Sequence, residues 1–354
     1  MEKIKIILTV ILSIIFIDNL QSQNSKVFPD STWLKHDTIE KVGYDSKKFN
    51  EINRFIIDSL NTTGLVVIVD GKILFDYGDI DELSYIASCR KSILSMIYGK
   101  YVENNTINLD ETLEELEFDD IQGLLPIEKK ATVRNLITAR SGIYHPASND
   151  GSDNNNNPGR GSMKPGTYFL YNNWDFNAAG AIFEQQTGLN IYDAFKKDIA
   201  IPIRMQDFER EKQEKSGNQR KSKYLAYHFW FSTRDMARLG LLMLNMGNWD
   251  GEQIIPKDWI KLITSVTTST DEMNSYWCKE GNYAYGYMWW IWEKYNNPDL
   301  EGAYLATGAY GQYILVIPKL NMVIAHKTKS DYKRNTDKDS FEKLVYKILD
   351  LKMK

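Results

Sequence analysis

The sequence is poor in the residues that build metal centres and disulfide frameworks. Only two cysteines, Cys89 and Cys278, and four histidines occur in 354 residues. Two thiols so far apart in a chain of this length predict buried free cysteines rather than a disulfide framework. No cysteine or histidine pair has the spacing of a metal site, and the H-E-x-x-H pattern is absent. We therefore expect no metal site.

The sequence also lacks a large excess of positive or negative charge. The chain has 43 Lys and Arg residues against 47 Asp and Glu residues, so no long-range field favours nucleic acid or an anionic membrane as a partner. A hydrophobic content of 43% and an aromatic content of 12% suffice for a large core and exclude disorder as the main state. We expect one large domain or two closely packed domains.

Long hydrophobic runs are absent except at residues 6–17, which follow Lys3 and Lys5 and precede a polar segment. This run is shorter than the roughly 20 residues needed to span a bilayer, and its flanks are those of a secretory signal. We therefore expect a signal peptide at residues 1–22 and a mature chain of residues 23–354. The mature protein should be exported, periplasmic or secreted, without a membrane span.

Strand signals occur at both ends of the mature chain. Residues 65–69 and 73–77 are apolar, β-rich runs separated by Asp70-Gly71, a strong signal for a tight hairpin. Apolar residues at helical spacing predict a helix before this hairpin and a closing helix at the end of the chain. These two helices are predicted over residues 46–60 and 341–348. Further strands are predicted at residues 285–292, 313–317 and 322–325.

Helical periodicity dominates the middle of the chain. Helices are predicted near residues 93–102, 132–139, 177–187 and 232–244, and solvated loops over residues 148–161 and 209–223. The simplest architecture is α/β (α+β), with an antiparallel sheet built from both termini, flanking helices and a helical subdomain. The sheet lobe would comprise about residues 40–85 and 280–354, and the helical lobe about residues 88–250.

Ser88 and Lys91 are the strongest candidates for chemistry. An apolar helical stretch follows them, so Ser88 should lie at a helix N-terminus with Lys91 one turn later on the same face. A serine hydroxyl needs a base to become a nucleophile. Lys91 can be that base only if burial lowers its pKa from about 10.4, because desolvation disfavours the ammonium form. Burial of this pair is therefore the condition for its activity.

Ser-x-x-Lys alone is weak evidence, because it also occurs at Ser330 to Lys333 and at Ser340 to Lys343. The first of these copies falls in a charged stretch, and the second begins the terminal helix with its lysine on the exposed side. Only Ser88 introduces a helix apolar enough to lie in the interior. Context therefore favours Ser88.

Tyr171-Asn172-Asn173 supplies a second candidate group. A tyrosine beside the nucleophile can pass a proton, either as a phenolate or through a hydrogen bond with Lys91. Asn173, two residues later in an extended segment, could hold Lys91 or a substrate amide. Residues 295–297 repeat the same pattern before a proline, which is typical of an ordinary turn, so we prefer Tyr171.

The order of these motifs resembles the serine β-lactamase and penicillin-binding-protein family, in particular its esterases and amidases related to class C β-lactamases. The matching segments, which together cover nearly all of the mature chain, are Ser88 to Lys91, residues 136–142, Pro165-Gly166-Thr167 with Tyr171 and Asn173, residues 231–237 and residues 285–290. The resemblance implies a two-lobed fold with the active site between the lobes. It also implies that no cofactor is needed.

The third motif of the family is a basic residue followed by Thr or Ser and Gly, and here Ala306-Thr307-Gly308 lacks the basic residue. In the family that residue helps to bind a substrate carboxylate, a charge-assisted contact of about 1.5–3 kcal/mol. Its absence favours a neutral ester or amide over a penicillin. The resemblance also implies that the N–H groups of Ser88 and Ala309 form the oxyanion hole.

The predicted function is hydrolysis of an ester or amide bond through a Ser88 acyl-enzyme, with Lys91 and Tyr171 as acid and base. The amide bond could be that of a β-lactam-like ring. The substrate would be a small or peptide-like molecule. Two alternatives stay open: a D,D-peptidase or β-lactamase acting on cell-wall peptides or drugs, and a catalytically silent binding or sensor protein with the same fold. The oligomeric state is not predicted.

Two further hypotheses concern other polar residues. A Ser-His-Asp triad around His145, His228 or His326 is disfavoured, because the G-x-S-x-G pattern is absent and no histidine has triad context. Arg160, in the Asn-rich loop, could border the cleft and supply the positive charge that Ala306 lacks. The aromatic cluster of residues 283–292 indicates core or cleft wall rather than a carbohydrate-binding platform.

Overall fold

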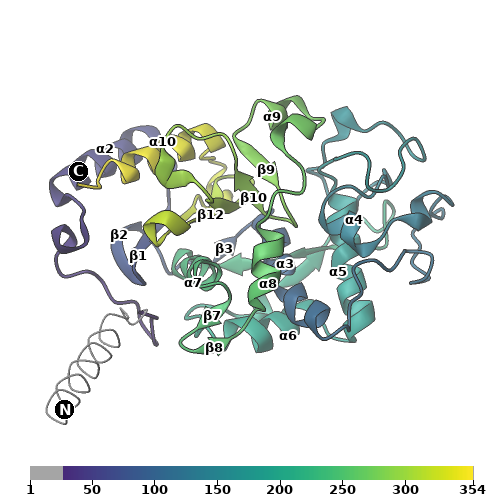
Figure 1. Ribbon diagram of the computed structural model, residues 1–354, viewed down its shortest axis with the longest axis horizontal. Helices are drawn as coiled ribbons and strands as arrows, with labels where there is room; N and C mark the ends of the chain where they lie inside the picture. Colours follow the sequence, from purple (N-terminus) through teal and green to yellow (C-terminus); the bar gives the residue numbers. More distant parts are fainter. Residues whose placement is uncertain (1–26, 354) are drawn as a thin grey trace, which may run out of the picture.

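The computed structural model describes residues 27–353 of the chain. The predicted signal peptide and its cleavage site lie outside these residues. In Figure 1, strands from the first and the last parts of the described chain form one sheet, and the middle of the chain extends to one side of it.

The core element is a seven-stranded antiparallel sheet with the strand order β2-β1-β13-β12-β11-β10-β9 (Figure 1). Its strands are β1 (Gly64–Val69), β2 (Lys72–Gly78), β9 (Tyr283–Tyr285), β10 (Trp290–Trp292), β11 (Tyr304–Gly308), β12 (Gln312–Ile317) and β13 (Met322–Lys327). The N-terminal hairpin joins the C-terminal strands through β1, which pairs with β13 from Gly64 opposite Lys327 to Val69 opposite Met322. The prediction of a sheet built from both termini is confirmed.

The Asp70-Gly71 turn between β1 and β2 forms as predicted. Asp70 has φ 50° and Gly71 has φ 78°, so both central residues are left-handed. That conformation gives a two-residue turn the twist of the strands beside it, and Asp-Gly is one of the few pairs that adopts it at low cost. Local sequence chemistry therefore sets the register of the first hairpin.

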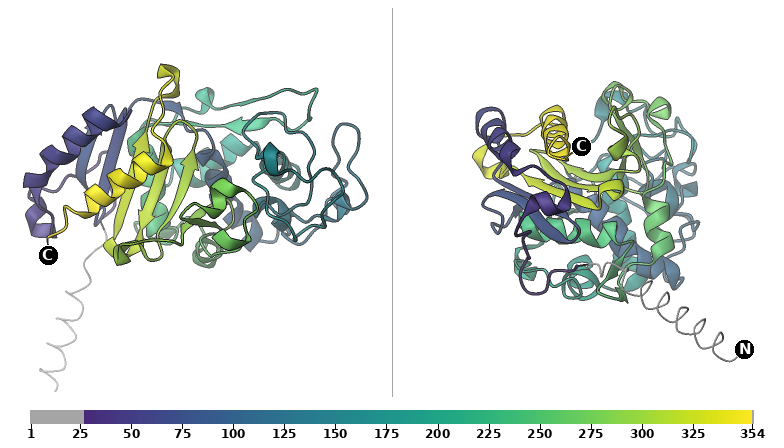
Figure 2. Two further views of the ribbon diagram at one scale, coloured as in Figure 1. Left: turned by 90° about the horizontal axis from the view of Figure 1, so that it is seen from above. Right: turned by 60° about the vertical axis from the view of Figure 1, so that its left-hand side comes forward.

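Helices cover both faces of the sheet. α2 (Phe49–Ser59) and α10 (Lys338–Leu349) lie side by side on one face, as Figure 2 shows, and Phe341 stacks on Tyr313 of β12 with ring centroids 4.0 Å apart. α7 (Thr233–Leu244) packs on the other face against β12 and β13. Gly240 of α7 allows this close approach, because a Cβ there would lie 2.4 Å from Val323.

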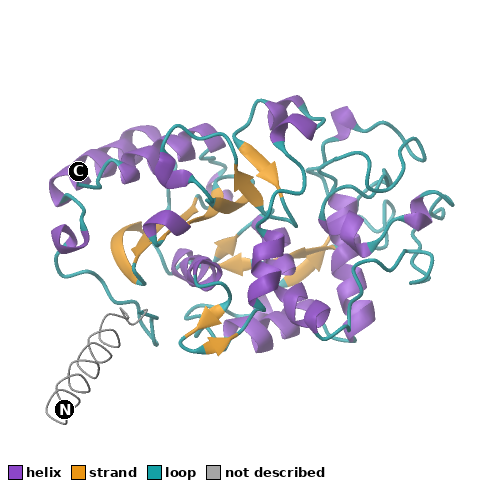
Figure 3. Cartoon of the chain, in the orientation of Figure 1, coloured by secondary structure: helices purple, strands orange, loops and turns teal. Residues whose placement is uncertain are grey.

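Most of the remaining helices form the part of the molecule beside the sheet (Figure 3). They are α3 (Cys89–Glu103), α4 (Val133–Ile137), α5 (Asn173–Thr187), α6 (Ile191–Phe195), α8 (Lys257–Ile263) and α9 (Tyr276–Lys279). α3 is buried on nearly all sides, since it packs against β11, α5 and α8. A helix enclosed in this way lies at the centre of its domain. It therefore connects the sheet to the helical part.

Short two-stranded pairings complete the fold. They join β3 (Ser84–Tyr85) to β6 (Trp230–Phe231), β4 (Glu214–Ser216) to β5 (Ala226–His228) and β7 (Asn248–Trp249) to β8 (Glu252–Gln253). Part of the predicted loop over residues 209–223 is thus a strand, because β4 finds a partner in β5. Within the described residues, none of the helices has the length and apolarity to cross a bilayer.

The predicted single strand at residues 285–292 is instead two antiparallel strands joined by a tight connection. Trp290 of β10 pairs with Tyr285 of β9, and Met288 between them has φ 63°. Two serine hydroxyls of α3 hold this connection: Ser92 Oγ donates to the Met288 carbonyl at 2.6 Å and Ser95 Oγ to the Tyr287 carbonyl at 2.7 Å. Contacts with α3, which sequence periodicity does not reveal, break the strand here.

Candidate active site

Ser88 lies where a strand turns sharply into α3. Ala87, immediately before it, has φ 48°, a left-handed conformation that costs a residue with a Cβ about 1 kcal/mol or more. The segment is fixed by the Ile86 N–H, which donates to the Phe229 carbonyl at 3.1 Å. Ser88 is then the N-cap residue of α3, as predicted. Surrounding structure therefore holds a strained turn that presents the Ser88 hydroxyl at a helix N-terminus.

Lys91 contacts both of the other candidate groups. Its Nζ lies 3.1 Å from Ser88 Oγ and 2.6 Å from Tyr171 Oη. The Tyr171 hydroxyl is also hydrogen-bonded to Ser88, so the three side chains form a closed set. Lys91 is only 2% exposed. The predicted neighbourhood of Ser88, Lys91 and Tyr171 is present in the structure.

Burial shifts the pKa values of the two proton-carrying groups in opposite directions. Desolvation, helped by the nearby charge of Arg90, holds the pKa of Lys91 well below its ordinary value of 10.5. The rings of Tyr171 and Phe176, 4.0 and 4.6 Å from Nζ, favour the ammonium form, but burial outweighs them. Desolvation raises the pKa of Tyr171 above its ordinary value. Burial therefore favours the neutral amine of Lys91 and the protonated phenol of Tyr171.

Tyr171 is brought to Lys91 by contacts that involve distant segments. The Leu170 N–H donates to the Ala139 carbonyl at 2.9 Å, and the Tyr171 carbonyl accepts from Asp153 N–H at 2.9 Å. Its ring contacts those of Phe176 and Trp290 at centroid distances of 5.1 and 5.7 Å. These contacts fix the phenol with little freedom to rotate.

The end of β11 forms the opposite wall of the site. Thr307, Gly308 and Ala309 line a hollow of about 540 Å³ together with Ser88 and Tyr171. Gly308 permits the close approach, because a Cβ there would lie 2.5 Å from the Ile86 carbonyl oxygen and 3.1 Å from the Ser88 nitrogen. The segment that carries the Ala309 N–H thus lies directly against the Ser88 turn, as an oxyanion hole requires.

Replacing Gly308 with alanine should move β11 away from the Ser88 turn. The added methyl would meet backbone atoms, which cannot yield as a flexible side chain can. Misplacement by about 1 Å can cost roughly 100-fold in rate, so we expect kcat to fall by about this factor. Steady-state hydrolysis of an activated acetyl ester would measure it. Gly302→Ala is the control: no atom lies within 4 Å of its Cβ position, and its φ of 75° strains an alanine outside the site, so stability should fall while kcat is kept. Unchanged kcat in Gly308→Ala would contradict the role of this contact.

The structure does not place Asn173 as predicted. It is the first residue of α5 rather than part of an extended segment, and its Nδ2 donates to the Asp150 carbonyl at 2.5 Å. Its buried Oδ1 accepts no hydrogen bond from any described residue, so it does not hold Lys91. The helix start after Asn172 turns the side chain toward the 148–161 loop. A role of Asn173 in binding a substrate amide stays a prediction.

The charges around the hollow differ from those expected. Arg160 does not replace the basic residue missing at Ala306: its guanidinium donates to the buried carboxylate of Glu128 and to the Gly123 carbonyl. Among the residues that line the hollow, the charged one is Asp337, the N-cap of α10. Among the described residues, the lining of this hollow includes no cation for a substrate carboxylate, and the cations Lys333 and Arg334 line an adjoining hollow that shares Tyr310 and Asn335.

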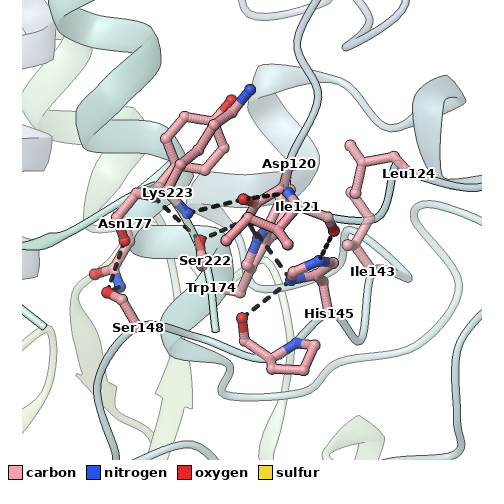
Figure 4. A network of polar contacts seen from close by, with 12 residues as sticks. Asp120, Ile121, Leu124, Ile143, His145, Ser148, Trp174, Asn177, Ser222 and Lys223 are labelled. Atoms are coloured by element: carbon pink, nitrogen blue, oxygen red, sulfur yellow. Dashed lines mark hydrogen bonds and ion pairs between the residues drawn. The ribbon is translucent and has the colours of Figure 1, made fainter. Parts of the chain in front are cut away.

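The three histidines considered for a triad lie in other environments. His228 and His326 are buried, and desolvation lowers the pKa of each to about 4. His145 belongs to a buried network around Asp120, whose carboxylate also accepts from Ser222 and from Trp174 Nε1 (Figure 4). In this network the serine bonds the carboxylate rather than the imidazole. The network anchors Trp174 at the start of α5 to Asp120 and does not have the geometry of a catalytic triad.

The other two Ser-x-x-Lys copies lie on the surface. Ser330 begins a single 3₁₀ turn, and its Lys333 is exposed. Lys343 of the second copy is exposed on α10. Neither lysine has the burial that would make it a base. The preference for Ser88 thus agrees with the burial of the three copies.

Sequence reasoning missed several residues of the hollow: Trp290, Tyr310, Gly311, Tyr313, Asn335 and Asp337. The aromatic cluster of residues 283–292 gave a partial signal for Trp290. Tyr310 and Gly311 come from the turn after β11, Tyr313 from the start of β12, and Asn335 and Asp337 from the approach to α10. None of these segments carries a motif. Within residues 27–353, no group of three or more His, Cys, Asp or Glu residues is placed to hold a metal ion.

The family model described as Beta-lactamase matches residues 56–346. The chain belongs to the β-lactamase family. This β-lactamase-family protein has the fold of that family's serine hydrolases, and its structure resembles those of class C β-lactamases. One class C β-lactamase gives a TM-score of 0.63 at 16% identity, with 89% of this chain and 98% of that chain covered.

Two further proteins are similar to this β-lactamase-family chain. A Bacillus anthracis protein provisionally assigned as a 6-aminohexanoate-dimer hydrolase has a TM-score of 0.63 at 20% identity, with 92% of this chain and 88% of that one covered. An uncharacterised protein of Alkalihalophilus pseudofirmus is 28% identical over 102 residues, which span 27% of this chain and 29% of that protein. The structural likenesses at 16% and 20% identity show the fold.

Proposed function

We propose that this protein hydrolyses an ester or amide bond through an acyl-enzyme formed on Ser88. The observation that carries the proposal is the position of Lys91 Nζ, 3.1 Å from the Ser88 hydroxyl and 2.6 Å from the Tyr171 hydroxyl in a buried setting. A base this close to the nucleophile needs no rearrangement before proton transfer.

The first half of the reaction forms the acyl-enzyme. Neutral Lys91 takes the proton of the Ser88 hydroxyl while Oγ bonds to the substrate carbonyl carbon. The carbonyl oxygen gains the negative charge and accepts from the N–H groups of Ser88 and Ala309. The proton then passes from Lys91, directly or through Tyr171, to the departing alcohol or amine as its bond to carbon breaks. Lys91 is neutral again when the leaving group departs.

The second half repeats these steps with water. A water molecule gives a proton to Lys91 and bonds to the acyl carbon. The resulting oxyanion accepts hydrogen bonds from the same two N–H groups. Its collapse breaks the bond to Ser88 Oγ, which recovers the proton from Lys91. The raised pKa of Tyr171 and the lowered pKa of Lys91 support Lys91, rather than a phenolate, as the base in both halves.

A substrate without a carboxylate beside the reacting carbonyl is favoured. Ala306 stands where the family has a basic residue, Arg160 is paired with Glu128, and Asp337 gives the hollow an anionic edge. These features weaken binding of a penicillin-like anion, which would lose a contact of about 1.5–3 kcal/mol. We therefore place the esterase or amidase function before a D,D-peptidase or β-lactamase function.

A covalent probe and a substrate panel test this proposal. Purified protein lacking residues 1–22 is treated with a fluorophosphonate and assayed with p-nitrophenyl acetate, an aryl acetamide and a chromogenic cephalosporin. We expect labelling and faster turnover of the ester than of the cephalosporin. Faster cephalosporin hydrolysis would favour the β-lactamase alternative. An acyl-enzyme that forms and does not decay would favour the silent binding protein, and no labelling would reject the nucleophile.

Export is part of the proposal. The basic, apolar and polar segments of residues 1–23 support a cleaved signal and a periplasmic or secreted site of action. Expression of the full chain with a C-terminal tag, followed by mass measurement of the product in the periplasm or medium, would test this. Full-length mass in the cytoplasm would contradict it.

A further inference from the structure

A second cavity of about 400 Å³ adjoins the Ser88 hollow. Both spaces are lined by Trp290, Thr307 and Tyr313, so they share a wall formed by β10, β11 and β12. The ring of Trp290 also contacts Tyr171, 5.7 Å between centroids, which places one edge of the second cavity beside the catalytic set. A group bonded to a carbonyl at Ser88 could therefore extend into it.

The lining of this cavity is mainly apolar and aromatic. We call it the aromatic pocket, and its side chains are Cys278, Tyr283, Trp290, Leu305, Thr307 and Tyr313. Leu305, Tyr313 and Trp290 are at most 7% exposed and belong to paired strands, so the walls are rigid. Tyr313 is fixed further by its stacking on Phe341. A preformed apolar space of this size is typical of a ligand site.

Charge is confined to the side of the pocket at the start of α10. Lys338 lies with its Nζ 5.5 Å from the centre of the Tyr283 ring, and exposed Asp339 is its neighbour. These two opposite charges next to each other give no net preference for an ionic group. The wall shared with the Ser88 hollow carries none. Burial of apolar surface is thus the interaction the pocket offers.

We propose that the aromatic pocket binds an apolar chain or ring of the substrate while its carbonyl is attacked by Ser88. The inference rests on the proposed hydrolase function and specifies its substrate class: esters or amides with a medium-length alkyl or an aryl substituent. Each methylene that leaves water for such a pocket gains about 0.8 kcal/mol, or roughly a fourfold rise in kcat/KM. The gain should end when the pocket is full.

Two series of esters locate the substituent. The first varies the acyl chain of p-nitrophenyl esters from acetyl to decanoyl, and the second varies the alcohol of acetate esters from methyl to octyl. We expect kcat/KM to rise several-fold per methylene over the first added carbons of one series. A rise in the first assigns the pocket to the acyl group, and a rise in the second assigns it to the leaving group. Flat profiles in both would overturn the inference.

Variants at Cys278 test whether this pocket is the cause. Cys278 is a buried free thiol on α9, outside the catalytic set, so Cys278→Phe fills the pocket and Cys278→Ser is the size-matched control. We expect the ratio of long-chain to acetyl kcat/KM to fall at least tenfold in Cys278→Phe and to fall much less in Cys278→Ser, which keeps the volume of the pocket. An unchanged ratio in a folded Cys278→Phe protein would overturn the inference.

Failure of this inference is distinguishable from failure of the proposed function. If wild type hydrolyses the acetyl ester with a flat chain-length profile, the hydrolase proposal stands and the aromatic pocket has no part in binding. If wild type hydrolyses no ester or amide and takes no fluorophosphonate label, the proposed function itself is rejected. Should Cys278→Phe not fold, the two wild-type series still decide the inference.

Discussion

Ser88→Ala is expected to abolish hydrolysis, with kcat lowered by about 10⁵- to 10⁶-fold and fluorophosphonate labelling lost. Removal of a serine nucleophile leaves only the oxyanion hole and substrate binding, and losses of this size follow in enzymes that use such a group. Fold should be kept, since the backbone N–H of residue 88 and the Ala87 turn do not depend on the hydroxyl. Circular dichroism and thermal melting would check this.

The sequence offers a matched control for the nucleophile. Ser340 begins an identical Ser-x-x-Lys pattern on α10, where its lysine is exposed. Ser340→Ala should keep full activity and full labelling. Equal labelling of Ser88→Ala and wild type would place the reactive serine elsewhere and sink the proposed mechanism.

Lys91→Met should lower kcat by about 10²- to 10⁴-fold, the contribution typical of a general base. Methionine keeps much of the length and the apolar stem of lysine, so the surroundings can pack as before. Lys343→Met, at an exposed position one turn after Ser340, is the matched control and should be neutral. Near-normal kcat in Lys91→Met would assign the base to another group.

The pH profile separates a base from a merely structural lysine. Lys91 accepts a proton only when neutral, so wild-type kcat/KM should fall as pH decreases through a pKa well below 10.5. This acid limb should be missing from the residual activity of Lys91→Met. Stopped or initial-rate assays from pH 4 to 10 on a substrate that does not titrate would show it. A limb that persists in the variant would belong to another group.

Stability should depend on pH in the same direction. The unfolded chain binds a proton at Lys91 up to about pH 10.5, whereas the folded chain releases it at lower pH. The unfolded state thus holds more protons in this window, and stability from this group rises with pH. Lys327, whose pKa burial lowers to about 7, contributes with the same sign. Lys91→Met should therefore gain thermal stability relative to wild type as the pH falls.

Features that depend on neighbours in the sequence were predictable, and features that depend on distant segments were not. The position of Ser88 at a helix N-terminus, the one-turn spacing of Lys91 and the Asp70-Gly71 hairpin were predictable, because each depends on neighbours within a few residues. The division of residues 285–292 into two strands was not, because hydroxyls of α3 cause it. The prediction for Asn173 was wrong for a related reason: α5 begins at this residue, and the helical backbone sets the direction of its side chain.

What the sequence determined by itself is the set of groups available for chemistry and their order, together with a sheet drawn from both termini. Which of these groups come into contact depends on the tertiary structure. Tyr171 reaches Lys91 across 80 positions through contacts with Ala139, Asp153 and Trp290. Packing of α3 between the sheet and the other helices removes water from Lys91 and so lowers its pKa. Desolvation is a property of the assembled interior, and no short segment of sequence carries it.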